Sequence, residues 1–531
     1  MNPRHLIAGA CLAAVGATAH ADVITDWNVI AGDTIINAKI GTPPANRVIA
    51  FVQTAVYDAV VAAGTTANVD AAVAAANRVT LVKLLPSQET AVNTAYQAAL
   101  AKLPDGPAKA AGIAAGEKAA AAVLARRLDD GAATPERYRP HAAAGAYVPT
   151  AAVAAPQWVQ RKPWNLASPG QFRPGPPPAL TSAQWVRDYE EVRALGAKAS
   201  TKRSVEQTEI ARFWEYSLPP VYHAVLRSVA QQPNRTVAQN ARLFAVASQA
   251  MDDGLIAGLE AKYHYNFWRP VTAIRNGDLD QHDGTPLEAG WASLIDAPLH
   301  PEYPSTHSIL AGVITGVLQA EGGNLPVLST SSPTAGGATR KWKTVDDLAR
   351  EISVSRIYAG IHFRTATEVG LVMGKQIGSQ AVAQFALAPA GDAKLVERVA
   401  ARGVQVYECR ADKAAATGAQ WVFVAPQAEL FDSQGKPSGT HYAGPHWEAA
   451  DGSRIVGKVE ARAEAPEAGA IPWLLLSARS VGGTGRYASV TSIQRVNTTG
   501  GLAPSQRCDK GMVGKTDKVP YTADYLLYAS S

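Results

Sequence analysis

Apolar residues recur at every third or fourth position along most of the chain between about residues 47 and 390. This spacing places them on one face of a helix, so the pattern predicts helices rather than strands. Many of these segments are rich in alanine, and several are followed by a glycine, which is typical of a helix end. The clearest predicted helices are 46–64, 88–103, 108–131 and 241–268.

Two segments inside this region do not fit a helix. Residues 168–182, SPGQFRPGPPPALTS, are interrupted by prolines, which cannot occupy a helix interior, and we expect a long ordered loop there. Residues 324–342 are rich in Gly, Ser and Thr and are predicted as a second loop.

The pattern changes after about residue 400, where short β-type runs are separated by turn signals such as Asp451-Gly452. The predicted fold class is therefore a multidomain α + β protein. A large all-α helical-bundle domain, 22–395, precedes a small β-rich domain, 404–531, of sandwich or barrel-like form. The β-type runs are 403–411, 420–426, 454–461, 471–478 and 487–496.

The first 21 residues have the pattern of a secretory signal peptide. Arg4 and His5 precede an apolar stretch at 6–16, and Ala19-His20-Ala21 offers small residues for cleavage before Asp22. The alternative is a buried N-terminal helix. No later apolar run reaches the length that spans a bilayer, so we expect a soluble exported protein, periplasmic or secreted.

Composition adds few constraints. Of 531 residues, 47% are hydrophobic and 18% charged, as in globular proteins, and the length suggests two domains. The net charge of +5 is not concentrated in a basic stripe, so nucleic acid is not an expected partner. Cys11 lies in the signal peptide, which leaves Cys409 and Cys508 for one disulfide in an oxidising compartment, or as two buried thiols.

The first segment with candidate chemistry is AKYHYNFWRPVTAIR, 261–275. Lys262 and Arg269 are seven residues apart, two helical turns, so both cationic groups would emerge on nearly the same face. Pro270 follows directly and threatens to end or kink the helix. Two buried cations need an anion, although a solvated basic edge is the simpler interpretation of this pair alone.

The second segment is HPEYPSTHS, 300–308, which leads into the apolar helix that starts at about Ile309. Ser305 and Thr306 stand where the helix begins, and free backbone N–H groups at a helix N-terminus can bind an anion. His307 lies in the first turn, where it could exchange a proton with that anion. Taken alone, Pro-Ser-x-His is a weak pattern, and an ordinary helix cap with no ligand is the better interpretation.

The third segment, VSRIYAGIHFRTATEVG at 354–370, holds Arg356 and His362 six residues apart. A histidine beside small residues is usually a packed core residue. In combination, however, Lys-x6-Arg-Pro, Pro-Ser-x-His and Ser-Arg-x5-His occur in order on a helical background. This set resembles the superfamily of vanadium-dependent haloperoxidases and type 2 phosphatidic-acid phosphatases.

The resemblance implies a cofactor and the residues that bind it. Lys262, Arg269 and Arg356 would hold the equatorial oxygens of a tetrahedral oxyanion, and Ser305 and the backbone N–H of Thr306 would add donors. The implied cofactor is vanadate, and phosphate can occupy the same site.

It also implies catalytic roles. His362 would be the axial group, bonded to vanadium in a haloperoxidase or attacking phosphorus in a phosphatase. His307 would be the acid–base residue, and Lys262 would stabilise negative charge that develops on hydrogen peroxide polarised by the metal. His300 matches the histidine that bromoperoxidases of the family have at this place; otherwise it is an ordinary loop histidine.

Two positions depart from the family pattern. Thr306 replaces the usual glycine of Pro-Ser-Gly-His, and its branched side chain is expected to narrow the pocket. The family commonly has an Asp four residues after the axial histidine, where this chain has Ala366. Glu368 or a backbone carbonyl is expected to orient His362 instead.

The sequences of the segments YNFWRPVTAIR, FRPGPPP and AGIHFRT are similar to those of bacterial haloperoxidase-type members. The resemblance therefore implies oxidation of a halide, bromide rather than chloride. The partners would be hydrogen peroxide, halide and an organic acceptor, with no membrane span and with a homo-oligomer left open. The alternatives are a secreted acid phosphatase that forms a phosphohistidine on His362 and an oxyanion-binding protein that has lost catalysis.

The C-terminal region resembles an uncharacterised family of exported bacterial domains, through VQVYECRA, the segment at 428–459, IPWLLLSA and CDKG. His441, His446 and Trp447 form its most polar-aromatic cluster. We expect the edge of a β-sandwich there rather than a metal or ligand site, and a Cys409–Cys508 disulfide that stabilises the domain.

Overall fold

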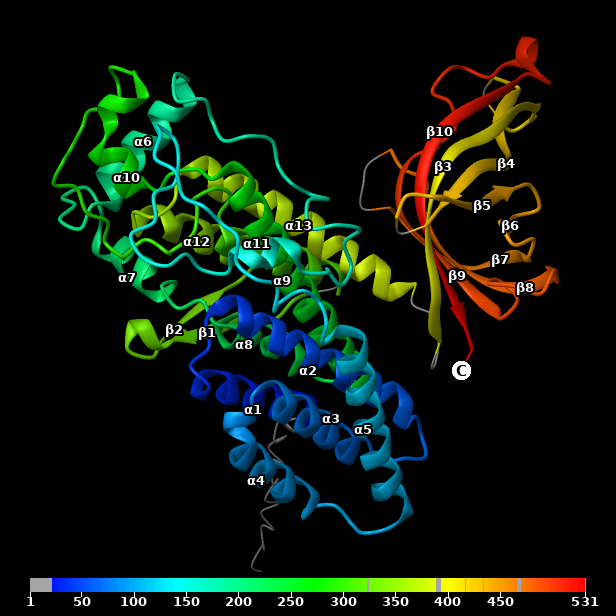
Figure 1. Ribbon diagram of the computed structural model, residues 1–531, viewed down its shortest axis with the longest axis horizontal. Coiled ribbons are helices and arrows are strands. Elements are labelled where there is room, and N and C mark those ends of the chain that lie inside the picture. The colour runs from blue at the N-terminus through cyan, green and yellow to red at the C-terminus, as the bar shows by residue number, and fades with distance from the viewer. Residues whose placement is uncertain are drawn as a thin grey trace, which may run out of the picture.

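The structure is a computed structural model that describes residues 22–321, 324–387, 393–415, 417–432, 434–465 and 469–530. The predicted signal peptide, 1–21, lies outside the described residues. A helical domain is followed by a β-barrel, and α13 runs from the helical bundle towards the barrel (Figure 1). The predicted fold class is confirmed.

Side chains cap several of the helices: those of Ser182, Ser204, Thr236 and Thr344 each accept a backbone N–H two or three residues into the helix. Within the described ranges, no helix combines the length and the apolarity needed to cross a bilayer. The helices are α1 (Val23–Asn37), α2 (Thr42–Ala63), α3 (Val69–Leu84), α4 (Glu89–Leu100), α5 (Pro107–Arg127), α6 (Ala183–Gly196), α7 (Val205–Phe213), α8 (Pro219–Ala230), α9 (Val237–Tyr265), α10 (Pro270–Arg275), α11 (Thr306–Ala320), α12 (Val345–Tyr358) and α13 (Arg364–Ala386).

Three helices position the segments singled out in the sequence. α9 is buried along nearly its whole length and ends beside the start of α11. α11 and α13 approach each other closely along glycines: a Cβ on Gly374 would lie 2.0 Å from the carbonyl oxygen of Ile309, and one on Gly312 would lie 2.3 Å from that of Leu371. Only glycine allows this approach, which brings the first turn of α11 next to the loop before α13.

The loop predicted at 168–182 is present without helix or strand, and Tyr303 donates its hydroxyl to the carbonyl of Gly175 at 2.8 Å. The prediction for 324–342 is only partly right. It contains the antiparallel hairpin of β1 (Leu328–Ser332) and β2 (Ala338–Trp342), in which Leu328 and Trp342 pair. The helical domain is therefore not purely helical.

The C-terminal strands close into an antiparallel barrel in the order β10-β3-β4-β5-β6-β7-β8-β9. Its first strand begins at Lys394, ahead of residue 404 where the sequence predicts the domain to start, because pairing with β10 outweighs the helical tendency of an Ala- and Arg-rich stretch. The strands are β3 (Lys394–Ala411), β4 (Ala419–Phe431), β5 (Pro437–Tyr442), β6 (His446–Ala449), β7 (Arg454–Ala463), β8 (Trp473–Gly482), β9 (Val490–Gly500) and β10 (Thr516–Ala529).

His441 and Trp447 are buried inside this barrel, with ring centroids 4.1 Å apart. The predicted sandwich edge is therefore wrong, because the sheet closes and its inward face becomes a core. His446 points elsewhere and stacks on Tyr442. Within the described residues, no three His, Cys, Asp or Glu side chains gather as the ligands of a metal ion would.

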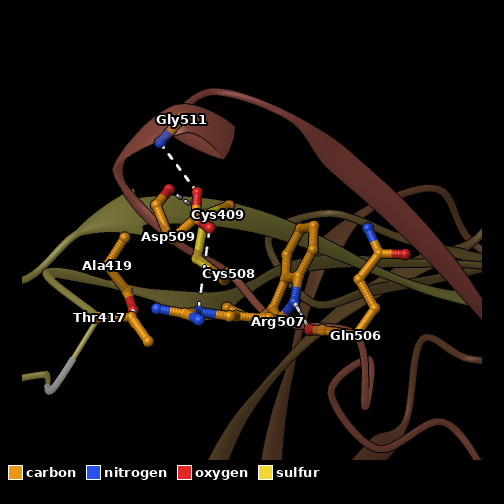
Figure 2. Close-up of a disulfide and its surroundings, with 9 residues drawn as sticks. Cys409, Thr417, Ala419, Gln506, Arg507, Cys508, Asp509 and Gly511 are labelled. Atoms are coloured by element: carbon orange, nitrogen blue, oxygen red, sulfur yellow. Dashed lines mark hydrogen bonds and ion pairs between the residues drawn. A yellow bond between two sulfur atoms is a disulfide. The ribbon is translucent and has the colours of Figure 1, made fainter.

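Apolar packing joins the barrel to the helical domain, and a disulfide crosslinks the barrel. Leu387, at the end of α13, packs against Trp473, Val496 and Leu526, and Gln494 donates to the carbonyl of Gln384 at 2.9 Å. The predicted Cys409–Cys508 disulfide is confirmed, and it links β3 to the loop before β10 (Figure 2).

Candidate active site

The chain reverses direction between the two cations of the first segment. α9 ends at Tyr265, and Asn266 takes the left-handed conformation, φ 47°, with its N–H bonded to the carbonyl of Lys262 at 2.8 Å. Arg269 is then the N-cap of α10, whose first residue is Pro270. The prediction of one helix face carrying both cations is therefore wrong, because proline starts a new helix instead of continuing the old one.

The side chains of both cations nevertheless reach the same short stretch of backbone, residues 300–302. Lys262 donates its Nζ to the carbonyls of Pro301, at 3.0 Å, and Glu302, at 2.8 Å. Arg269 donates its Nε to the carbonyl of His300 at 2.9 Å. Lys262 is 0% exposed and Arg269 is 1% exposed, so the second segment is bound by two buried cations from the first.

Arg269 also joins the second segment to the third. Its guanidinium donates to the carbonyl of Ile361 at 2.7 Å and lies 3.2 Å from Nε2 of His362. Another of its nitrogens lies 3.0 Å from Nδ1 of His300. His300 is half-buried, as is His307, whereas Lys262 and Arg269 are buried.

The start of α11 matches the predicted cap. Ser305 is the N-cap and its hydroxyl accepts from the backbone N–H of Ser308 at 3.5 Å, while its own N–H donates to the carbonyl of Ala366 at 3.0 Å. Thr306 has an ordinary negative φ, so this position does not need glycine. Its γ-methyl faces α9, where a Cβ on Gly258 would lie 3.0 Å away, so the expectation that it narrows the pocket is not supported.

Arg356 and His307 meet at one carbonyl. Arg356 donates to the carbonyl of Trp214 at 2.6 Å, and the His307 ring also hydrogen-bonds the backbone of Trp214. Nε2 of His307 and Nε of Arg356 are buried and have no hydrogen-bond partner among the described residues. Both side chains thus keep a polar atom available to a ligand.

Glu302 belongs to this cluster although the sequence did not point to it. It is 0% exposed, and its Oε1 accepts from Nδ1 of His362 at 2.8 Å and from the backbone N–H of Phe363 at 2.9 Å. The sign in the sequence was a glutamate between Pro301 and Tyr303 in the second segment. Nothing near it indicated its partner, because His362 lies 60 residues further along the chain.

Glu368, which was predicted to orient His362, does not contact it. Glu368 lies on α13 with a side chain 64% exposed, and its nearest cation is Arg364 at 3.9 Å. Ala366 is buried in an apolar cluster with Trp185 and Phe363, where no carboxylate is needed. The carboxylate that contacts His362 belongs to Glu302 instead.

Burial and mutual repulsion dominate the electrostatics. Burial, the neighbouring charge of Arg269 and that of Arg356 lower the pKa of Lys262 well below its ordinary range, against the opposing charge of Glu302. Burial lowers the pKa of Arg269 and that of Arg356 to about 10. Burial also raises the pKa of Glu302 to about 7, although Lys262 and Arg269 oppose the rise. Positive charge is therefore in excess here.

The histidines share this environment. Burial and then the charge of Arg356 lower the pKa of His307 well below its ordinary value, and burial followed by Arg269 and Lys262 does the same for His362. Three buried cations beside one buried carboxylate form a site that lacks a compensating anion. With N–H donors at the start of α11, these residues fit a tetrahedral oxyanion such as vanadate or phosphate.

Family comparisons agree with this division of the chain. Residues 242–388, which hold all the residues of the cluster except Trp214, match the family described as VCPO second helical-bundle domain. Residues 389–529 match a family described as protein of unknown function (DUF3455), which covers the barrel.

The individual proteins that the chain resembles are vanadium haloperoxidases. Vanadium chloroperoxidase from Curvularia inaequalis is 31% identical over 173 residues, a segment that spans 27% of this chain and 28% of that enzyme. A bacterial vanadium-dependent iodoperoxidase shares the fold, with a TM-score of 0.57 and 24% identity over 67% of this chain and 95% of its own. A bacterial vanadium-dependent chloroperoxidase in its holo form has a TM-score of 0.52 and 20% identity, over 64% and 92% of the two chains.

Proposed function

Because the helical region of the chain belongs to the vanadium haloperoxidase superfamily, we propose that the protein is a vanadate-dependent haloperoxidase. It would oxidise a halide, bromide in preference to chloride, with hydrogen peroxide. The reaction balances as H2O2 + Br⁻ + H⁺ → HOBr + H2O, and the hypobromous acid would then react with an organic acceptor.

One observation supports this proposal above the others. Lys262 and Arg269 of the first segment and Arg356 and His362 of the third are all buried at 0–2% exposure beside the N-terminus of α11, which belongs to the second segment. Such a cluster of cations is stable in a protein interior only if an anion belongs there.

Each residue then has a task. Lys262, Arg269 and Arg356 bind and orient the oxygens of vanadate, and Ser305 with the first N–H groups of α11 adds donors. His362 would hold the metal through Nε2. Bound vanadate supplies a Lewis acid that polarises hydrogen peroxide.

His307 serves proton transfer. The consumption of one proton in the balanced reaction requires a group that can deliver it to a departing oxygen. Nε2 of His307 is buried and has no partner among the described residues, and the other side of the ring is held by the backbone of Trp214. This arrangement leaves Nε2 free to hold or release a proton in the pocket.

Halide preference rests on His300. His300 is half-buried, and its Nδ1 lies 3.0 Å from a guanidinium nitrogen of Arg269, one of the three cations. We expect H300F to favour chloride relative to bromide when the ratio of kcat/KM for the two halides is measured. An unchanged ratio would contradict the role of His300.

The function is tested by two assays on the purified full chain. With orthovanadate, peroxide and bromide, we expect halogenation of monochlorodimedone that H362A abolishes. Cleavage of p-nitrophenyl phosphate without vanadate, combined with no halogenation, would instead establish the phosphatase. Vanadate binding without either activity would establish a protein that has lost catalysis.

We further infer that the protein is exported and soluble and that the barrel is a stabilising or binding appendage. Residues 1–21 and the Cys409–Cys508 disulfide support export, since disulfides persist in oxidising compartments. Mass spectrometry of the mature protein should find Asp22 at the N-terminus. Retention of residues 1–21 in the mature chain would contradict export through a cleaved signal peptide.

A further inference from the structure

Glu302 connects the three segments of the site through both its main chain and its side chain. Its N–H donates to the carbonyl of Phe267 at 2.9 Å, and its carbonyl accepts from Lys262 at 2.8 Å. Its side chain accepts from His362 and from the N–H of Phe363. A residue fixed at four points holds its carboxylate in one place.

That fixed carboxylate decides which nitrogen of His362 carries the proton. The carboxylate Oε1 is an acceptor 2.8 Å from Nδ1, so Nδ1 must donate, and the backbone N–H of Phe363 keeps the same oxygen in the accepting role. Nε2 is then unprotonated, and it lies 3.2 Å from Nη1 of Arg269, on the side of the cations, where its lone pair can accept. This is the tautomer that can bond a metal centre.

We propose that Glu302 is the positioning residue of His362, which it holds with Nδ1 protonated and Nε2 available for the oxyanion. It thereby supplies from the second segment what an acid four residues after His362 would supply, a position occupied here by Ala366. The hydrogen bond stands on its own geometry, whereas its use for vanadate rests on the proposed function.

A second consequence concerns the choice between two similar anions. Vanadate and phosphate have closely similar shape and charge, so removal of the carboxylate changes the electrostatic attraction for both alike. Vanadate would bond to Nε2 when it binds, whereas free inorganic phosphate is bound there without such a bond. The ratio of the two dissociation constants therefore isolates the effect of Glu302 on His362 from its effect on the charge of the pocket.

The test combines a spectroscopic and a binding measurement on the full chain. In protein labelled with 15N-histidine, with the His362 resonances assigned through H362Q, we expect the Nδ1–H tautomer in the wild type. E302L should lose this tautomer and should lower the preference for orthovanadate over phosphate by about 10–100-fold, as expected for a partner of a metal ligand. E302Q keeps an acceptor oxygen, so it should keep the tautomer and lose a smaller part of the preference.

The control is E368Q, which removes the exposed carboxylate of α13 and should change neither measurement. A wild-type protein with the proton on Nε2 would overturn the proposal, as would a preference within about twofold of wild type in E302L. If E302L does not fold, the test rests on E302Q. His362 resonances at their wild-type positions, together with an unchanged preference for orthovanadate over phosphate, would then overturn the proposal. A tautomer and a preference that behave as expected, in a protein that does not halogenate, would refute the proposed function and leave this inference intact.

Discussion

The γ-methyl of Thr306 on α11 lies against the backbone of Gly258 on α9. A Cβ built on Gly258 would lie 3.0 Å from this methyl and 2.9 Å from Cδ1 of Ile309. The branched residue at the start of α11 therefore fills space on α9 that glycine leaves open, while its N–H remains at the helix N-terminus.

This contact predicts that G258A destabilises the helical domain by about 1–3 kcal/mol, because the added methyl overpacks a filled interface. The double variant G258A/T306G should recover part of the loss. Thermal unfolding of the full chain measures both, with G290A as the control, since a Cβ there meets nothing within 4 Å. Equal effects of G258A and G290A would contradict the packing argument.

Arg356 predicts an effect on anion binding without a loss of stability. R356M removes a buried charge whose Nε has no partner among the described residues, so the ligand-free protein should unfold at an unchanged or higher temperature. Binding of phosphate should weaken about 10–100-fold, as expected for one charge-assisted contact. Calorimetric titration with phosphate and a thermal scan without it give the two quantities.

The matched control is R350M, on the same helix, whose side chain is 69% exposed and pairs with Asp347. It should bind phosphate like the wild type. Equal weakening in both variants would indicate a general change of charge, and no weakening in R356M would remove Arg356 from the site.

Local features of the site could be predicted from the sequence, and long-range ones could not. Ser305, Thr306 and His307 are adjacent, so the cap and the histidine follow from three residues and a helix signal. The pairing of Glu302 with His362 depends on how α11 packs on α13, which no local pattern encodes. The single helix face for Lys262 and Arg269 failed for a similar reason, since the turn at Asn266 was hidden in a continuous helical pattern.

The barrel shows the same limit. Alternating residues identified its strands, but the pairing of β10 with both β3 and β9 closes the sheet, and closure places His441 and Trp447 in a core. Alternation specifies which residues share a face, and only strand order specifies whether that face is an edge or an interior.

A buried ion network that includes Asp252 of α9 predicts a pH dependence of stability. Arg161, 1% exposed, bonds Asp130 and Asp252, with 2.9 Å between its Nη2 and Oδ2 of Asp252. Burial alone would raise the pKa of Asp130, but the charges and hydrogen bonds of Arg161 and Arg47 outweigh it and hold the pKa below 3.8. The folded-state pKa is thus the lower one, so the stabilisation is complete above the unfolded-state pKa and is lost as pH falls through the folded-state value.

D130N should therefore cost about 3–5 kcal/mol at pH 7, because it leaves a buried cation partly unpaired. The difference from the wild type should shrink below about pH 4. Urea unfolding from pH 3 to 8 measures it, with D105N as an exposed control on the Lys109 pair. A difference between wild type and D130N that grows as the pH falls would contradict the assigned sign.

The disulfide predicts that the two domains differ in their response to reduction. Cys409 and Cys508 are separated by 99 residues, and a crosslink of this length removes about 4–5 kcal/mol of unfolded-chain entropy in the loop-closure account. C409A/C508A should therefore lower the free energy of unfolding of the barrel by about 2–5 kcal/mol. The phosphate affinity should stay unchanged, because every residue of the site lies in the helical domain.

Denaturant unfolding followed by circular dichroism, with phosphate titration of the same sample, measures the two effects. Loss of phosphate binding in parallel with the barrel transition would show instead that the packing of Leu387 against Trp473 makes the two domains one cooperative unit.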